Sequence, residues 1–110
     1  GTDFVPGYGT PVGAIADGVV TWVGRDKTNF GYYVTIAHVI DGVRVDSLYA
    51  HLVDDSSATY GLYPGLEVKV GSFIGDTGNT GFSTGPHLHL EIHLEGEPVN
   101  PYEWLTVNAR

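Results

Sequence analysis

Cysteine and methionine are absent from the 110 residues, and lysine and arginine together number only five. Without cysteine the chain forms no disulfide framework, and this absence fits a cytoplasmic and a secreted protein equally. The five basic residues are scattered, whereas phosphate binding needs a positive patch, so nucleic acid is not expected as a partner. No apolar run approaches the roughly 20 residues of a membrane span.

Acidic residues and glycine are the abundant features. Thirteen acidic residues give a formal net charge of −8, which favours solubility over recognition of a cationic substrate. Sixteen glycines, six prolines and seven tyrosines favour short strands joined by tight turns. We therefore predict an all-β fold in a single domain that spans residues 1–110, because this length suits one core.

Residues 32–52 carry the clearest hairpin signal. Asp41 and Gly42 form the two-residue turn that type I′ geometry favours, with strand-like residues on both sides. Pairing outward from this turn places His51 opposite Tyr32, although a single bulge would reverse the parity. Further short strands are predicted in residues 10–24 and 64–75, whereas residues 54–63 are predicted to form a polar loop.

Strict alternation marks residues 87–94, directly after a glycine-rich loop at residues 76–86. In a strand, His87, His89, Glu91 and His93 share one face. The opposite face carries Leu88, Leu90, Ile92 and Leu94, which we expect to enter the core. Imidazoles two residues apart lie roughly 6–7 Å from one another along a strand, so both can line one small site. This clustering favours a site over an exposed polar face that happens to contain histidines.

Histidine and aspartate are suitable donors for zinc. Zinc hydrolases commonly present three protein ligands and keep the fourth position for water. Asp3, close to the start of the chain, is a candidate ligand because separation in sequence does not prevent proximity in the fold. Taken alone, however, an aspartate in this position is more often a turn residue.

Three ordered segments resemble the motifs of the lysostaphin/LytM-type zinc endopeptidases. They are residues 1–4 (GTDF), 48–52 (LYAHL) and 78–91 (GNTGFSTGPHLHLE). The resemblance implies a LytM-like fold of the duplicated-hybrid-motif type, in which a mostly antiparallel sheet floors a groove walled by loops. The expected walls are residues 25–31, 54–63 and 76–86.

The resemblance also implies roles for individual residues. It makes Asp3 and His89 zinc ligands, and His51 and His87 the catalytic pair beside the attacking water. His38 is interpreted as structural and His93 receives no role. Glu91 is expected to hydrogen-bond nearby groups and to orient a histidine.

One departure from the family pattern concerns the metal ligands. Relatives carry a further histidine ligand four residues before the aspartate, and this position falls upstream of Gly1. The chain also starts abruptly, without an initiator methionine, so we expect that an upstream portion has been removed. The alternative is a catalytically silent LytM-like module that binds peptidoglycan or activates a partner amidase.

A carrier domain of the lipoyl or biotinyl type is a third interpretation, with Lys27 as the modified residue. It leaves the paired histidines without explanation, and a mass spectrum without an added cofactor would dismiss it. We therefore expect a monomeric, Zn²⁺-dependent endopeptidase that acts on bacterial peptidoglycan peptides. It is expected to be extracytoplasmic, whether secreted, periplasmic or cell-wall associated, with membrane contact only through an upstream anchor.

Overall fold

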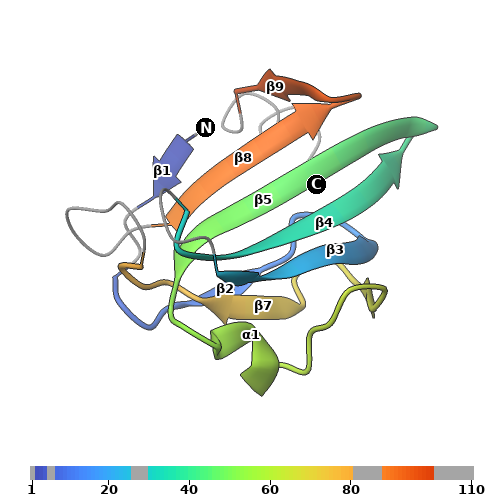
Figure 1. Cartoon of the computed structure of the whole chain (residues 1–110). Helices are drawn as coiled ribbons and strands as arrows, with labels where there is room; N and C mark the ends of the chain where they lie inside the picture. The colour runs from blue at the N-terminus through green and yellow to red at the C-terminus, as the bar shows by residue number, and fades with distance from the viewer. Residues whose placement is uncertain (1, 5–6, 26–29, 81–87, 101–110) are drawn as a thin grey trace.

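A computed structural model describes residues 2–4, 7–25, 30–80 and 88–100 of the chain, with the backbone alone for residues 2–4. Its largest element is a seven-stranded, antiparallel sheet (Figure 1). The path through this sheet runs β1-β8-β5-β4-β3-β6, and β9 pairs with β8 beside it. These strands are β1 (Thr2–Phe4), β3 (Gly18–Arg25), β4 (Tyr32–Ile40), β5 (Val43–Leu52), β6 (Glu67–Val68), β8 (Leu88–Leu94) and β9 (Glu97–Val99). The predicted all-β, mostly antiparallel class is confirmed.

A smaller layer lies below the main sheet (Figure 1). It contains the two-stranded sheet of β2 (Pro11–Gly13) and β7 (Phe73–Asp76), together with the single-turn helix α1 (Ser56–Thr59). Apolar side chains of both layers form one cluster that includes Val34, Ile36, Leu52, Ile74 and Ile92, all fully buried. This packing leaves the opposite, outer face of the main sheet as the candidate groove floor.

The predicted hairpin is present, with one local difference. Asp41 and Gly42 both have positive φ, as a type I′ turn requires, and the pairing follows the prediction as far as Val34 and Tyr49. The register then shifts, so that Tyr32 lies opposite Leu52. The predicted pairing of Tyr32 with His51 is therefore wrong, because a bulge inserts one residue into the ladder.

Residues 10–24 contain the two expected strands: β2 pairs with β7, and β3 pairs with β4 and β6. The next predicted segment differs from the structure. Residues 54–63 are not simply a polar loop, because they include α1. Its Ser56 and Ser57 are buried: the Ser57 hydroxyl donates to the carbonyl of Ile74, and the Ser56 hydroxyl accepts from the amide of Asp76. These bonds fasten the segment to β7.

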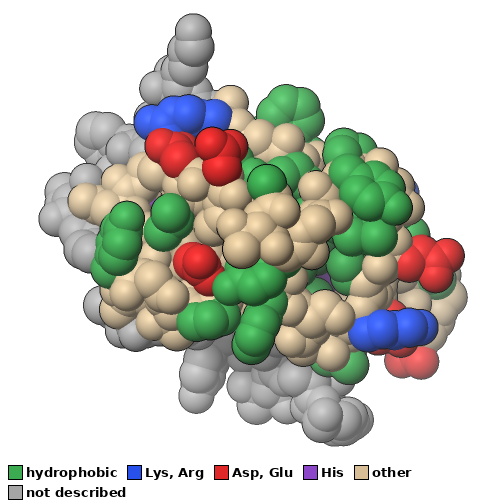
Figure 2. All heavy atoms as spheres, turned by 90° about the horizontal axis from the view of Figure 1, so that it is seen from below, with side chains coloured by type: hydrophobic (Ala, Val, Ile, Leu, Met, Phe, Trp, Pro, Cys, Tyr) green, Lys and Arg blue, Asp and Glu red, His purple; other side chains and the backbone are tan. Residues whose placement is uncertain are grey.

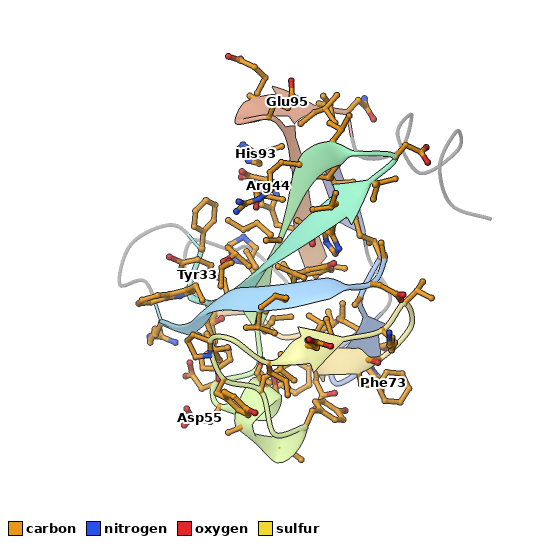
Figure 3. The ribbon with its side chains drawn as sticks, turned by 90° about the vertical axis from the view of Figure 1, so that its right-hand side faces the viewer. Tyr33, Arg44, Asp55, Phe73, His93 and Glu95 are labelled. Atoms are coloured by element: carbon orange, nitrogen blue, oxygen red, sulfur yellow. The ribbon has the colours of Figure 1, made fainter. Side chains whose placement is uncertain are left out.

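Strand β8 has the predicted alternation. Leu90 and Ile92 are buried in the core, whereas His89, Glu91 and His93 are only partly covered. Figure 3 shows Tyr33 of β4, Arg44 of β5 and His93 on the same side of the main sheet, so these three strands share the outer face.

Charged side chains are sparse on the lower side of the molecule. Figure 2 shows the basic side chains there lying singly beside acidic ones, between scattered hydrophobic side chains. Tyr63, Val70 and Phe73 are among the exposed apolar residues. Within the described part of the chain, no helix is long and apolar enough to cross a membrane.

Candidate active site

His89 lies where three strands meet. In β8 it is opposite Ala50 of β5 on one side and opposite Asp3 of β1 on the other. Directly opposed residues of antiparallel strands have Cα atoms about 4.5–5.5 Å apart, so this register brings the backbones of Asp3 and His89 together from distant parts of the sequence. His51, the neighbour of Ala50, lies at the same end of the sheet.

The ring of His51 approaches that of His89, with centroids 5.9 Å apart and planes inclined by 60°. His51 has a left-handed backbone, with φ of 62°, which is uncommon for a residue other than glycine. Its amide donates to the carbonyl of Phe30 at 2.8 Å, and its carbonyl accepts from the amide of Gly78 at 2.9 Å. Such a conformation costs about 1–3 kcal/mol and persists where the surroundings fix it, often at functional sites.

Thr80 fixes the tautomer of the His51 ring. Nδ1 lies 2.6 Å from the carbonyl oxygen of Thr80, which can only accept, so Nδ1 carries the proton and donates it. In the neutral ring the lone pair is therefore on Nε2. The Thr80 hydroxyl also accepts from the amide of Tyr32 at 3.0 Å and donates to the carbonyl of Leu52 at 2.6 Å. One residue thus joins the glycine-rich segment to β4, to β5 and to the His51 ring.

Glu91 lies between two histidines on the outer face. Nε2 of His89 donates to one carboxylate oxygen and Nε2 of His93 to the other, both at 2.9 Å. Partial burial works to raise the pKa of Glu91, but the hydrogen bonds from His93 and His89 outweigh it, and the pKa lies below its ordinary value. The bond to Nε2 also places the lone pair of a neutral His89 on Nδ1 and orients the ring.

Aromatic side chains continue from His89 across the outer face. Phe30 stacks on His89 with centroids 6.1 Å apart, Tyr33 lies 5.3 Å from Phe30, and Trp22 stacks on Tyr33 at 5.7 Å. Sequence reasoning missed these residues. The available signal was Gly24, because a glycine inside a strand often marks a close approach, and here a Cβ atom would lie 2.9 Å from the Trp22 ring.

His38 lies apart from these groups. It is buried beneath the sheet, where Nδ1 donates to the carbonyl of Asp17 at 2.9 Å and Nε2 lies 2.7 Å from the Ser47 hydroxyl. Ser47 in turn is bonded to the hydroxyl of Tyr49, which accepts from the amide of Ile15. Burial lowers the pKa of His38, against the weaker, raising effect of the Asp17 carbonyl. This geometry fits the structural role assigned to His38.

The residues at the β1–β8 seam fit a zinc ion in chemical type. Imidazole and carboxylate are its usual nitrogen and oxygen donors, and the strand register places the backbones of His89 and Asp3, one residue of each type, opposite one another. Among the residues that the structure describes, no group of three histidine, cysteine, aspartate or glutamate side chains is placed to hold a metal. His87 lies outside the described residues, as does the side chain of Asp3, so their roles remain predictions.

His51 and His89 lie on the open face of an antiparallel sheet, at the seam with Asp3, and these are residue types that metal-dependent hydrolases use. Peptidase family M23 matches residues 1–101, and the chain belongs to this family. The predicted resemblance to LytM and lysostaphin is confirmed.

Curated relatives include the DD-carboxypeptidase/endopeptidase Mpg of Neisseria meningitidis serogroup B, 48% identical over 101 residues, which are 92% of this chain and 21% of Mpg. The peptidoglycan DD-endopeptidase ShyA of Vibrio cholerae is 42% identical over 100 residues, with 91% of this chain and 21% of ShyA covered. The glycyl-glycine endopeptidase ALE-1 of Staphylococcus capitis is 41% identical over 92 residues, covering 83% and 23%. The chain thus spans about a fifth of the length of these relatives.

Solved structures agree with the family assignment. The catalytic domain of lysostaphin from Staphylococcus simulans superposes with a TM-score of 0.80 at 32% identity, covering 94% of this chain and 76% of that domain. A zinc-containing peptidase from Vibrio cholerae gives a TM-score of 0.77 at 37% identity, covering 90% of this chain and 28% of that one.

Proposed function

We propose that the chain is the catalytic domain of a zinc-dependent endopeptidase that hydrolyses peptide bonds in bacterial peptidoglycan. The observation that carries this proposal is the convergence of His51, His89 and the backbone of Asp3 at one end of the outer face. ShyA, a peptidoglycan DD-endopeptidase, supports this substrate class, and the endopeptidases Mpg and ALE-1 support the reaction type.

Asp3 and His89 would hold the zinc, together with the histidine that relatives carry four residues before the aspartate. Bound zinc supplies Lewis-acid chemistry, in that it polarises the scissile carbonyl and lowers the pKa of water. Nδ1 of His89 is the suitable donor, because Nε2 donates to Glu91. Glu91 is thus a positioning residue, which fixes the tautomer and the orientation of the ring.

His51 is the proposed general base. Its Nε2 carries the lone pair, since Nδ1–H is bonded to Thr80, so it can take a proton from the attacking water. Protonated His51 can then return this proton to the leaving amine. His87 is proposed as its partner beside the water, where an imidazolium would stabilise the oxyanion.

The substrate implies the location. Because peptidoglycan lies outside the cytoplasmic membrane, we propose that the whole protein is extracytoplasmic, as a secreted, periplasmic or cell-wall-associated enzyme. We propose that the domain acts as a monomer. Fractionation that finds the full-length protein only in the cytoplasm would contradict the cell-wall assignment.

The experiment separates catalytic residues from metal ligands. In a chain extended upstream through the expected histidine, His51→Ala or His87→Ala should lower the hydrolysis rate by about 10²–10⁴-fold and leave zinc bound. His89→Ala should lose the zinc as well. The substrates are purified peptidoglycans with glycyl cross-bridges and with direct cross-links, analysed by mass for new termini, and the zinc content is measured by atomic emission.

Two outcomes would contradict the proposal. Zinc loss from His51→Ala equal to that from His89→Ala would make His51 a ligand rather than a base. A zinc-loaded, unsubstituted chain that binds peptidoglycan but hydrolyses neither of the two substrates would instead be the catalytically silent module.

A further inference from the structure

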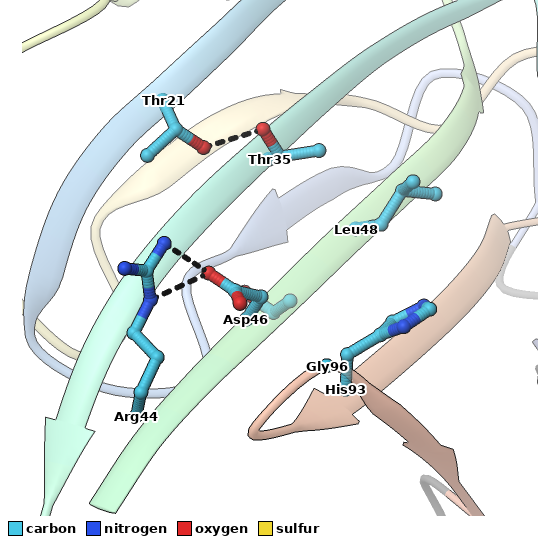
Figure 4. A pocket seen from close by; sticks show the side chains of 8 residues that line it. Thr21, Thr35, Arg44, Asp46, Leu48, His93 and Gly96 are labelled. Atoms are coloured by element: carbon cyan, nitrogen blue, oxygen red, sulfur yellow. Dashed lines mark hydrogen bonds and ion pairs between the residues drawn. The ribbon is translucent and has the colours of Figure 1, made fainter.

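A pocket of about 320 Å³ opens on the outer face of the main sheet, separate from the His51–His89 pair (Figure 4). Its lining side chains come from β3, β4, β5 and β8: Thr21, Thr35, Arg44, Asp46, Leu48 and His93. A bulge in β3 after Val20 lets both Thr21 and Trp22 contact this face of β4. The pocket therefore continues the surface on which the candidate active site lies.

The distance from the active site can be expressed in substrate residues. His93 follows His89 by four positions in β8, and a strand rises about 3.3 Å per residue, so the pocket lies about 13 Å along the sheet. An extended peptide covers nearly the same length per residue. A peptide cleaved beside His89 and His51 and lying along β8 would place its third or fourth residue from the scissile bond in the pocket.

Arg44 and Asp46 supply opposite charges side by side in the pocket. Nε and Nη2 of Arg44 both contact Oδ1 of Asp46, at 3.0 and 2.8 Å. Within the described residues, Oδ2 of Asp46 can accept a hydrogen bond from a further donor. The Arg44 guanidinium has five N–H groups, so it can donate to a ligand as well as to Asp46. The two side chains are 57% and 33% exposed, and ion pairs this open are weak, so a ligand can insert or share their bonds at low cost.

The other lining groups suit a small polar head rather than a large apolar one. The hydroxyls of Thr21 and Thr35 form a pair 2.6 Å apart on one wall, and each also offers lone pairs. Leu48 contributes an apolar side chain. On the far wall Nε2 of His93 donates to Glu91, so this N–H group is already used within the protein.

We propose that this pocket binds an amino-acid head group, with an α-ammonium and an α-carboxylate on one carbon, carried by the substrate peptide. A lone anion would meet Asp46, and a lone cation would meet Arg44, whereas a zwitterion can satisfy both at once. A peptide carries such a head group where a side chain ends in a carbon whose amino and carboxyl groups form no peptide bonds. The peptide part of this inference rests on the proposed function, but the affinity of the pocket for the head group does not.

Nuclear magnetic resonance of the full chain tests the affinity directly. The probes are alanine, N-acetylalanine, which keeps only the carboxylate, and alaninamide, which keeps only the ammonium. Alanine should shift the Arg44 Nε–H resonance and the amides of Thr35 and Asp46 at millimolar concentrations. The two blocked probes should bind about tenfold more weakly, because each lacks one charged hydrogen-bonding partner.

Substitution of Asp46 or Arg44 should change which of the three probes binds best, and not only weaken the binding of alanine. Asp46→Asn should bind N-acetylalanine at least as well as alanine, and Arg44→Gln should do the same with alaninamide. Glu67→Gln and Lys69→Gln, on exposed side chains at the opposite edge of the sheet, are matched controls and should bind like the unsubstituted chain. Thermal unfolding checks that all four variants are folded.

Peptide hydrolysis tests the subsite. A peptide that carries the free head group three or four residues from the scissile bond should have a KM about tenfold lower than the form in which the head-group carboxylate is amidated, with equal kcat, and Arg44→Gln should abolish the difference. Equal binding of all three probes, or no binding of alanine at tens of millimolar, would overturn the pocket assignment. Alanine binding with equal KM values for both peptides would overturn the subsite. A zinc-loaded chain, extended upstream through the expected histidine, that binds alanine but hydrolyses no peptidoglycan would refute the proposed function alone.

Discussion

Thr80→Val should destabilise the fold and weaken catalysis together. The substitution keeps the shape of the side chain but leaves the amide of Tyr32 and the carbonyl of Leu52 without the hydroxyl that bonds both. Each partly buried group left unpaired costs about 1–3 kcal/mol, so a loss of about 3 kcal/mol is expected. The Thr80 carbonyl that holds His51 would lose its anchor, and the hydrolysis rate should fall as well.

Urea denaturation measures the effect. With an m-value of about 1.5 kcal/mol/M, this loss lowers the midpoint by about 2 M. Thr35→Val is the matched control, because its hydroxyl is bonded to Thr21 on the exposed surface, and its midpoint should move by less than about 0.5 M. Equal midpoints for the two variants would refute the reasoning that Thr80 joins these segments.

Three further predictions concern the core, pH and zinc. Gly18→Ala should destabilise by at least about 1–3 kcal/mol, because the added Cβ would lie 2.4 Å from the carbonyl oxygen of Ala37; a variant as stable as the parent in urea would contradict this. Because burial lowers the pKa of His38 in the folded state, the unfolded chain binds more protons below about pH 6.5, so stability should fall as pH drops through this value. In urea denaturation between neutral and mildly acidic pH, the His38→Gln variant should lose less stability than the parent as the pH drops. An equal loss of stability in both proteins would contradict this prediction. In calorimetry, extension upstream through a histidine four residues before Asp3 should tighten zinc binding, whereas equal one-to-one affinity and equal activity would show that this histidine is not a ligand.

The outline of the fold was predictable because its signals are local. Strict alternation in β8 identifies the buried and the open face, and the Asp41-Gly42 turn fixes the hairpin register near itself. Beyond Val34 the register depends on a bulge that leaves no clear mark in composition. The pairing of β2 with β7 was not predicted for a related reason, because contacts between residues 60 to 65 positions apart in the sequence are decided by core packing.

The candidate site was predictable in residue type but not in detail. His51 and His89 were selected from motifs, and the structure brings their rings together. The carbonyl of Thr80, which fixes the His51 tautomer, could not be predicted, because any residue has a carbonyl and only the fold directs one. The aromatic strip through Phe30 likewise depends on side chains that the bulged strands turn to one face.

Because β1 pairs with β8 over only three residues, zinc binding by the proposed ligands Asp3 and His89 would be coupled to the docking of this edge strand. A zinc ion held by Asp3 and His89 would bridge an edge strand and the sheet, so the cost of ordering β1 is subtracted from the intrinsic affinity. Conversely, every increment of free zinc would shift β1 toward its docked state. Hydrogen exchange at Thr2, Asp3 and Phe4 should therefore slow as zinc is added, and the slope against the logarithm of zinc concentration would report the strength of this coupling.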